Sequence, residues 1–160
     1  FALGKYNVND TITTARFAID KGINFFDTAD CYNLGKSEEN LAKATLGVSR
    51  EKLILSTKFG VRLNNNSNNS NRVFHDNTSK WLDIALSNSL RRLKTDYIDL
   101  YQIHYWDKVT PLEETFKQLE RKCEKGIIRY YGVSNMGVLS KYVKDFPNLI
   151  SFSNEISLVN

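Results

Sequence analysis

Tyr97-Ile-Asp-Leu-Tyr-Gln-Ile-His104 is a mainly apolar run, rich in aromatic and β-branched residues, that ends in a chemically capable side chain. A run of this length and composition is typical of a largely buried β-strand. Three further runs share the design and end in Asp27, in Lys58, and in Ser134 with Asn135. In a parallel barrel the carboxyl ends of the strands meet on one face, which is where such barrels carry their active sites. The repeated design therefore predicts a fold and a site together.

Helical and strand patterns alternate along the chain, which predicts a parallel sheet with helices outside it. The expected strands cover residues 23–27, 53–58, 97–104, 130–134 and about 149–156, and residues 2–4 are a candidate remnant of a sixth. The expected helices start at Asp10 or Thr11, at Ser37 as N-cap, at Thr78 or Ser79, at a capping box formed by Thr110-Pro-Leu-Glu113, and after Asn135, the last ending near Phe146.

A doubly wound sheet is the structural alternative, but no Gly-x-Gly-x-x-Gly follows any expected strand, so no Rossmann phosphate turn is marked. A closed eight-stranded barrel takes about 200 residues or more, whereas the chain has 160. We therefore expect an incomplete (β/α)8 TIM barrel, from strand 1 or 2 to strand 6, that amounts to about two-thirds of the closed structure.

Asn64-Asn-Asn-Ser-Asn-Asn-Ser-Asn71 interrupts this alternation with a low-complexity polar segment. Such a segment cannot bury apolar surface, so we expect a disordered loop insertion at about residues 64–71. The remainder of residues 1–160 is expected to form one partial barrel domain.

The composition excludes several classes of function. The net charge is +4, and Lys and Arg are scattered rather than clustered, which argues against nucleic-acid binding. No apolar run approaches the roughly 18 residues of a membrane span. Cys31 and Cys123 have no partner spacing, which favours free thiols in a reducing compartment such as the cytoplasm. His75 and His104 cannot by themselves build a typical zinc site, so no metal is expected.

Asp27 and Lys58 each lie where an expected buried strand ends, and an unpaired charge there would be strongly destabilising. A structural ion pair is one interpretation. In the other, Lys58 lowers the pKa of the Tyr32 phenol, Asp27 holds Lys58 in place, and the set acts as a general acid. His104 is either a satisfied core residue or a group that orients and polarises a carbonyl oxygen.

The neighbouring polar and aromatic residues also allow two interpretations. Tyr105 and Trp106 either wall an apolar substrate pocket or are packed strand-end aromatics. Ser134 and Asn135 either cap a helix or hydrogen-bond a ligand amide at the barrel mouth.

Four segments, in order along the chain, resemble the aldo-keto reductase family. The first segment is Asn24-Phe-Phe-Asp-Thr-Ala-Asp-Cys-Tyr32 together with Gly35-Lys-Ser-Glu-Glu39. The other three are Ser56-Thr-Lys-Phe-Gly60, residues 90–104, and Gly132-Val-Ser-Asn135. The Gly-Lys-Ser-Glu-Glu loop is most similar to the branch of potassium-channel β subunits and bacterial stress-type reductases.

The resemblance implies a barrel that binds NADPH and transfers its hydride to a small-molecule aldehyde or ketone. By the family pattern, Tyr32 donates the proton, Lys58 and Asp27 tune it, and His104 orients the carbonyl. The implied cofactor contacts are Asp27, Ser134, Asn135 and Ser153. Ser153 departs from the pattern, because the family usually carries glutamine there.

Two alternatives to a reductase stay open. One is a non-catalytic, NADPH-binding regulatory subunit of the channel-β type, with an oligomer or a channel as its partner. The other is an inactive truncated fragment, since an unclosed barrel leaves strand edges unpaired and should aggregate or be molten.

Overall fold

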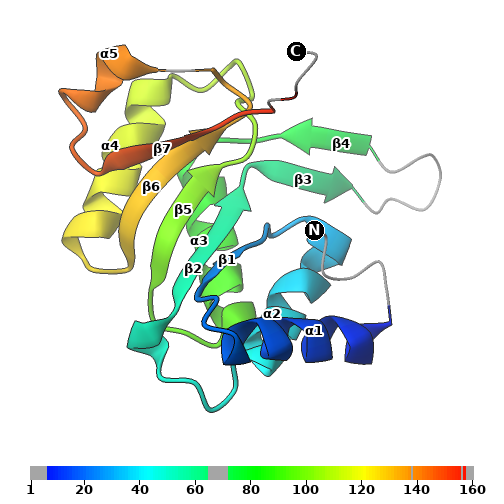
Figure 1. The fold of residues 1–160 in the computed structure, drawn as a ribbon. Helices are drawn as coiled ribbons and strands as arrows, with labels where there is room; N and C mark the ends of the chain where they lie inside the picture. The colour runs from blue at the N-terminus through cyan, green and yellow to red at the C-terminus, as the bar shows by residue number, and fades with distance from the viewer. Residues whose placement is uncertain (1–6, 65–71, 138, 156, 158–160) are drawn as a thin grey trace.

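The computed structural model describes residues 7–64, 72–137, 139–155 and 157. Within this part of the chain, five parallel strands form one curved sheet in the order β1-β2-β5-β6-β7 (Figure 1). The strands are β1 (Phe25–Asp27), β2 (Ile54–Phe59), β5 (Ile98–Ile103), β6 (Ile128–Ser134) and β7 (Leu149–Ser153).

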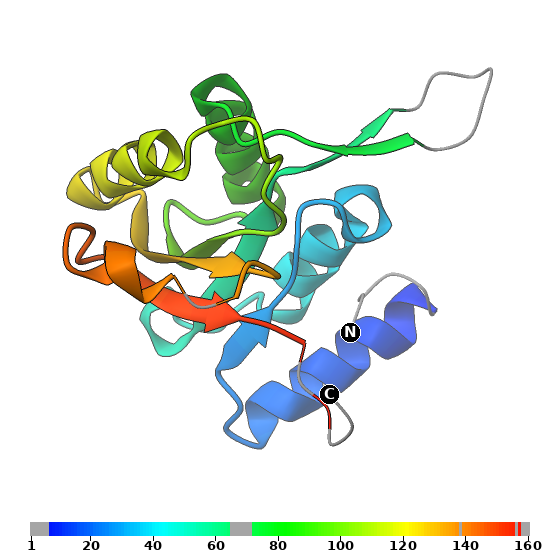
Figure 2. The same ribbon diagram turned by 90° about the horizontal axis from the view of Figure 1, so that it is seen from above.

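The main helices lie outside this curved sheet, as the view from above shows (Figure 2). The helices are α1 (Val8–Asp20), α2 (Lys36–Ala44), α3 (Ser79–Leu93), α4 (Leu112–Glu124) and α5 (Ser140–Val143), with short 3₁₀ turns η1 (Tyr32–Gly35) and η2 (Arg50–Lys52). A parallel half-barrel of this kind confirms the expected incomplete (β/α)8 architecture.

Side chains alternate between the two faces of the sheet, as the pleat of a strand requires. The outer face packs under α2, α3 and α4 and contributes large buried residues: Leu55, Phe59, Tyr101, Ile103, Tyr131 and Val133. On the inner face, the register places Lys58 beside Gln102 and Ser134 beside Ser153. The sheet thus separates an apolar core from a polar face that carries the candidate site.

Three expected helix starts were wrong, and in two of them the side chain bonds a residue that precedes the helix instead. Asn7, not Asp10 or Thr11, caps α1. Ser37 lies inside α2, where its hydroxyl bonds that of Thr28 at 2.8 Å. Thr110 donates its hydroxyl to Asp107 at 2.7 Å, and Pro111 is the N-cap of α4.

Thr78 does cap α3, as expected, and accepts a hydrogen bond from the backbone of Trp81. The last strand ends at Ser153 and is shorter than expected. Residues 2–4 lie outside the described residues, and so does residue 156.

An antiparallel hairpin follows β2 and was not predicted. It consists of β3 (Val61–Asn64) and β4 (Arg72–His75), which form their own two-stranded sheet and project from the barrel (Figure 1). The low-complexity segment begins at Asn64, which is the last residue of β3 and not part of a loop as expected, and residues 65–71 are outside the described residues. The insertion is therefore flanked by regular structure.

Phe116 on α4 offers a test of the core between α4 and the sheet. Its ring is fully buried and lies 5.3–5.8 Å from the rings of Tyr131, Tyr142 and Phe146. Phe116→Ala in the whole protein should lower the free energy of unfolding by about 3–5 kcal/mol, because a cavity replaces the ring. Val109→Ala, at a position 85% exposed, should change it by no more than about 0.5 kcal/mol. Urea unfolding measures both, and equal effects would contradict the packing described.

Candidate active site

Lys58 and Asp27 form an ion pair at the carboxyl ends of β2 and β1. Lys58 is 5% exposed, and its ammonium group donates to the Asp27 carboxylate and to the backbone oxygen of Thr28, the latter at 2.9 Å. The other carboxylate oxygen of Asp27 accepts the hydroxyl of Ser56 at 2.7 Å. The two acceptors satisfy the buried ammonium group and hold it in a single orientation.

Gln102 completes this network and was missed by the sequence analysis. Its side-chain amide donates to Ser56 Oγ at 3.1 Å and lies 3.4 Å from Asp27 Oδ1. The sequence does indicate this position, because Gln102 lies two residues before His104 and so on the same face of β5. In the structure it pairs with Lys58 in register.

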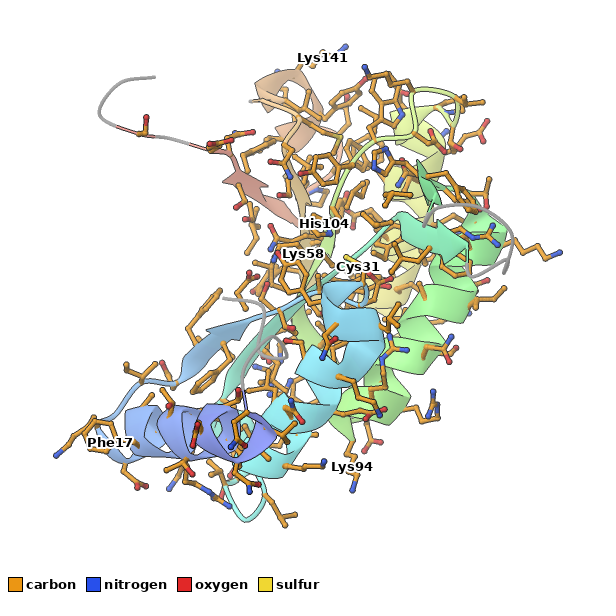
Figure 3. The ribbon with its side chains drawn as sticks, turned by 90° about the vertical axis from the view of Figure 1, so that its right-hand side faces the viewer. Phe17, Cys31, Lys58, Lys94, His104 and Lys141 are labelled. Carbon is orange, nitrogen blue, oxygen red and sulfur yellow. The ribbon has the colours of Figure 1, made fainter. Side chains whose placement is uncertain are left out.

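Tyr32 is brought over this network by the tight turn η1. Asn33 and Leu34 adopt left-handed backbone angles there, with φ of 48° and 56°. The Tyr32 ring centroid lies 5.6 Å from Lys58 Nζ and 5.7 Å from the imidazole of His104, which meets it edge-on. Lys58 and His104 lie close together between the strand ends and η1 (Figure 3).

The pKa of Tyr32 is raised above its usual value, by burial first and by the negative charge of Asp27 second. The sequence predicted a pKa lowered by Lys58, whereas the net shift is upward, because burial and the Asp27 carboxylate both disfavour a negative charge on the phenol. Tyr32 is consequently a protonated phenol at neutral pH.

His104 is 8% exposed at the end of β5. Burial, and next the positive charge of Lys58, lower its pKa from 6.5 to about 4. His104 Nδ1 lies 3.6 Å from the Cys31 sulfur, and Tyr105 stacks on the imidazole ring at 5.1 Å. The imidazole is therefore neutral at neutral pH and keeps one N–H donor.

A buried ion pair anchors the turn that carries Tyr32. Glu38 on α2 is fully buried and accepts hydrogen bonds from Arg92 of α3 at 2.6 Å and from Thr57 of β2 at 2.7 Å. Gly35 approaches the Arg92 side chain so closely that an added Cβ would lie 2.7 Å from Arg92 Cδ. Glu38 belongs to the Gly35–Glu39 motif, but no local sequence pattern predicts this role for it.

Ser134 and Asn135 lie together at the end of β6. The Asn135 side chain donates to the His104 carbonyl at 3.1 Å and to Ser134 Oγ at 3.0 Å. Among the described residues, no partner is found for the Ser134 hydroxyl proton or for Asn135 Oδ1. This adjacent donor and acceptor are complementary to a primary carboxamide.

Ser153, the third expected amide contact, is exposed at the end of β7. Its carbonyl accepts the backbone N–H of Asn135 at 2.8 Å, which aligns β7 with the Ser134–Asn135 pair. The next residue, Asn154, is turned toward the β6–α5 loop, where its Oδ1 accepts the N–H of Gly137 at 3.0 Å. Ser153, and not Asn154, therefore lies beside Ser134.

A cavity of about 730 Å³ lies beside these strand ends, and both Tyr105 and Trp106 line it, together with Asn135 and Met136. Trp106 donates its indole N–H to the carbonyl of Thr110 at 2.8 Å, which fixes the ring. The two aromatic residues expected to wall a substrate pocket therefore face a cavity large enough for a small ligand.

Other potential sites find no support in the described part of the chain. There, no group of three or more His, Cys, Asp or Glu residues is placed to hold a metal ion. Both cysteines are free thiols. No described helix has the length and apolar character needed to cross a membrane.

Replacing Glu38 tests the anchor beneath Tyr32. Glu38→Gln should lower the free energy of unfolding of the whole protein by about 3–5 kcal/mol, because the largely buried Arg92 loses its counter-charge. The matched control is Glu39→Gln on the same helix, which removes only an exposed pair with Lys36 and should cost less than about 1 kcal/mol. Comparable losses in urea unfolding would show that the buried pair anchors nothing.

The lowered pKa of His104 gives stability a defined pH dependence. The unfolded chain binds a proton near pH 6.5 and the folded chain only near pH 4, so the unfolded state binds more protons in between. The His104 contribution to stability should therefore rise with pH across this window, by up to about 3 kcal/mol, and level off above it, while buried Asp30, whose pKa is raised to about 8, contributes in the opposite direction. His104→Gln should remove the His104 contribution, which is measured as the difference between the pH profiles of the wild type and the variant in urea unfolding. An NMR titration midpoint of His104 near 6.5 would contradict the burial described.

Comparison with known proteins identifies the family of this arrangement. Residues 2–153 match the family model described as the aldo/keto reductase family. The uncharacterized oxidoreductase YqkF of Bacillus subtilis (strain 168) is 38% identical over 152 residues, which cover 94% of this chain and 48% of the relative.

Solved structures give the same result. The holo form of aldo-keto reductase AKR11C1 from Bacillus halodurans matches with a TM-score of 0.84 and 35% identity, over 98% of this chain and 51% of that one. An aldo/keto reductase from Klebsiella pneumoniae in complex with NADP and acetate matches with a TM-score of 0.66 and 28% identity, over 89% and 44%. The chain spans about half the length of these relatives, a smaller share than the two-thirds expected.

Proposed function

The chain belongs to the aldo/keto reductase family, and we propose that the whole protein is an NADPH-dependent oxidoreductase that reduces aldehyde or ketone carbonyls to alcohols. The observation that carries the proposal is the convergence of Asp27, Tyr32, Lys58 and His104 on one face, from three strand ends and the turn η1. A purely structural ion pair would need neither the phenol nor the imidazole beside it.

Tyr32 is the proposed general acid: its raised pKa keeps the phenol protonated at neutral pH, and it would donate the proton as the carbonyl oxygen gains negative charge and becomes strongly basic. When the phenol gives its proton to the carbonyl oxygen, the new phenolate lies near the Lys58 ammonium group, which stabilises it. Asp27 holds that ammonium group in place and charged. The stabilisation thus arises as the proton is transferred, when it lowers the barrier.

His104 is proposed to orient the substrate. Because its pKa is lowered to about 4, the ring is neutral and does not compete with Tyr32 as an acid. Its remaining N–H can donate a hydrogen bond to the carbonyl oxygen. Tyr105 and Trp106 would contact the rest of the substrate, a small-molecule aldehyde or ketone, in the adjacent cavity.

The residues at the ends of β6 and β7 fit the amide group of a nicotinamide cofactor. When bound, NADPH supplies the hydride. Ser134 and Asn135 present the donor and acceptor that a carboxamide requires, Ser153 lies beside Ser134, and Asp27 is close to the reacting centre. The choice of NADPH is supported by the relatives solved with NADP and with NADPH.

Tyr32→Phe tests the proposal in the whole protein. Loss of the general acid should lower kcat for benzaldehyde reduction by at least about 100-fold, while the NADPH dissociation constant stays within about twofold, because the phenol acts on the substrate. The matched control is Tyr97→Phe, just before β5 and at the end of the strand opposite to the site, where the hydroxyl accepts a hydrogen bond from Arg129. It should retain wild-type turnover.

The same assay separates the alternatives. Wild-type turnover in Tyr32→Phe would show that the four residues are not the catalytic set. NADPH binding without turnover of any carbonyl in the wild-type protein would favour a non-catalytic regulatory subunit. If the wild-type protein shows neither NADPH binding nor carbonyl turnover, the result would favour an inactive product.

A further inference from the structure

The β3–β4 hairpin reaches the candidate active site through a series of stacked rings. β4 ends at His75, whose imidazole lies 5.1 Å from the Tyr105 ring at an interplanar angle of 13°. Tyr105 in turn stacks on His104 at 5.1 Å and 23°. His75 was not singled out as a site residue from the sequence, because nothing in a lone histidine near a low-complexity segment indicates this stack.

Asn77, just after the hairpin, is fully buried and binds the loop that follows His104. Its backbone N–H donates to Asp107 Oδ2 at 2.9 Å, and the N–H of Asp107 donates to Asn77 Oδ1 at 2.7 Å. Its amide also donates to the Tyr105 carbonyl at 3.2 Å. These reciprocal bonds fix the backbone of Tyr105 relative to the hairpin.

The start of the hairpin packs against the same hydrogen-bonded residues, Asn77 and Tyr105. Gly60 joins β2 to β3 with a φ of +105°, and an added Cβ would lie 2.7 Å from Asn77 Nδ2 and 3.3 Å from the Tyr105 carbonyl oxygen. Both ends of the hairpin therefore meet the Tyr105 loop, and His75 is presented to the phenol ring from a fixed support.

His75, Tyr105 and Trp106 all line the cavity of about 730 Å³. Tyr105 is 40% exposed and Trp106 is 36% exposed, so large aromatic surfaces remain available to a ligand. Leu112, Met136 and Leu139 add apolar walls, and the polar part of the lining consists of Asp107, Lys108 and Asn135. A cavity with flat aromatic and apolar walls favours flat, apolar ligands, because ring stacking adds to the burial of apolar area.

We propose that His75 is a specificity-determining residue of this cavity, which selects carbonyl substrates with a planar aromatic body over short aliphatic ones. The proposal rests on the proposed reductase function. By stacking on Tyr105, His75 holds the phenol ring against His104, and the ring then presents an ordered surface beside the carbonyl site. Without His75, Tyr105 keeps its backbone position but loses one of the two stacking contacts that order its ring.

The test compares His75→Ala with His75→Phe in the whole protein, with benzaldehyde and butanal as substrates and NADPH as cofactor. The measured quantity is the ratio of kcat/KM for benzaldehyde to kcat/KM for butanal. One stacked ring pair corresponds to roughly a two- to tenfold effect, so His75→Ala should lower the ratio about fivefold, mainly through KM for benzaldehyde. His75→Phe retains a ring and should restore the ratio to within about twofold.

Val73→Ala is the matched control, because Val73 lies on the same strand, is 56% exposed and does not line the cavity. It should leave the ratio unchanged. If the hairpin has a purely structural role, His75→Ala should lower kcat/KM equally for benzaldehyde and butanal. The ratio would then stay unchanged, and this result would overturn the proposal. Failure of His75→Phe to restore the ratio would overturn it as well.

A second measurement does not depend on turnover. Benzamide, an unreactive planar amide, is titrated into each variant with and without NADP, and its dissociation constant is determined by NMR. His75→Ala should weaken binding about fivefold and His75→Phe should not; equal affinities would overturn the proposal. If wild type binds benzamide in this pattern but reduces no carbonyl, the proposed function fails while the role of His75 stands.

Discussion

The buried ion pair between Glu38 and Arg92 is the constraint on which the candidate site depends. It joins α2, α3 and, through the hydroxyl of Thr57, the strand β2. The turn that carries Tyr32 leads directly into α2 and packs against the Arg92 side chain through Gly35. Two charges that could not be buried separately therefore fix where the phenol lies. The helix layer sets the geometry of the inner face.

The inner face is polar at considerable cost in stability, and its polar groups satisfy one another. Lys58, Asp27, Ser56 and Gln102 form one connected network across β1, β2 and β5. A half-satisfied network in this position would be worse than an apolar one. The network also bears on the state of Tyr32, since the Asp27 carboxylate within it disfavours a second negative charge on the nearby phenol and so, after burial, helps to raise the pKa of Tyr32.

The strand-end residues were predictable because parallel topology places every carboxyl end on one face, whatever the loops do. The sequence alone was therefore enough to group Asp27, Lys58, His104 and Ser134. Residues whose roles come from tertiary partners could not be recognised in this way. Glu38 and Asn77 each bind residues at least 19 positions away, so no local pattern marks them.

The sequence preferences for helix N-caps gave wrong predictions where the side chain forms a hydrogen bond with a residue outside its helix. Ser37 and Thr110 have the right chemistry for N-caps but bond to Thr28 and Asp107 instead. The hairpin was missed because its strands have only four residues each and flank a segment whose composition predicts disorder.

The order of the strands also bears on how the chain folds. β2 pairs with β5, and the hairpin and α3 lie between them in the sequence. The central sheet therefore depends on distant contacts, which form slowly because the intervening chain must first be closed into a loop. The β3–β4 ladder pairs residues no more than 14 positions apart, from Val61 with His75 to Asn64 with Arg72. During synthesis on the ribosome this pairing needs no residue of β5, whereas the bonds of Asn77 to Tyr105 and Asp107 require the chain that follows β5.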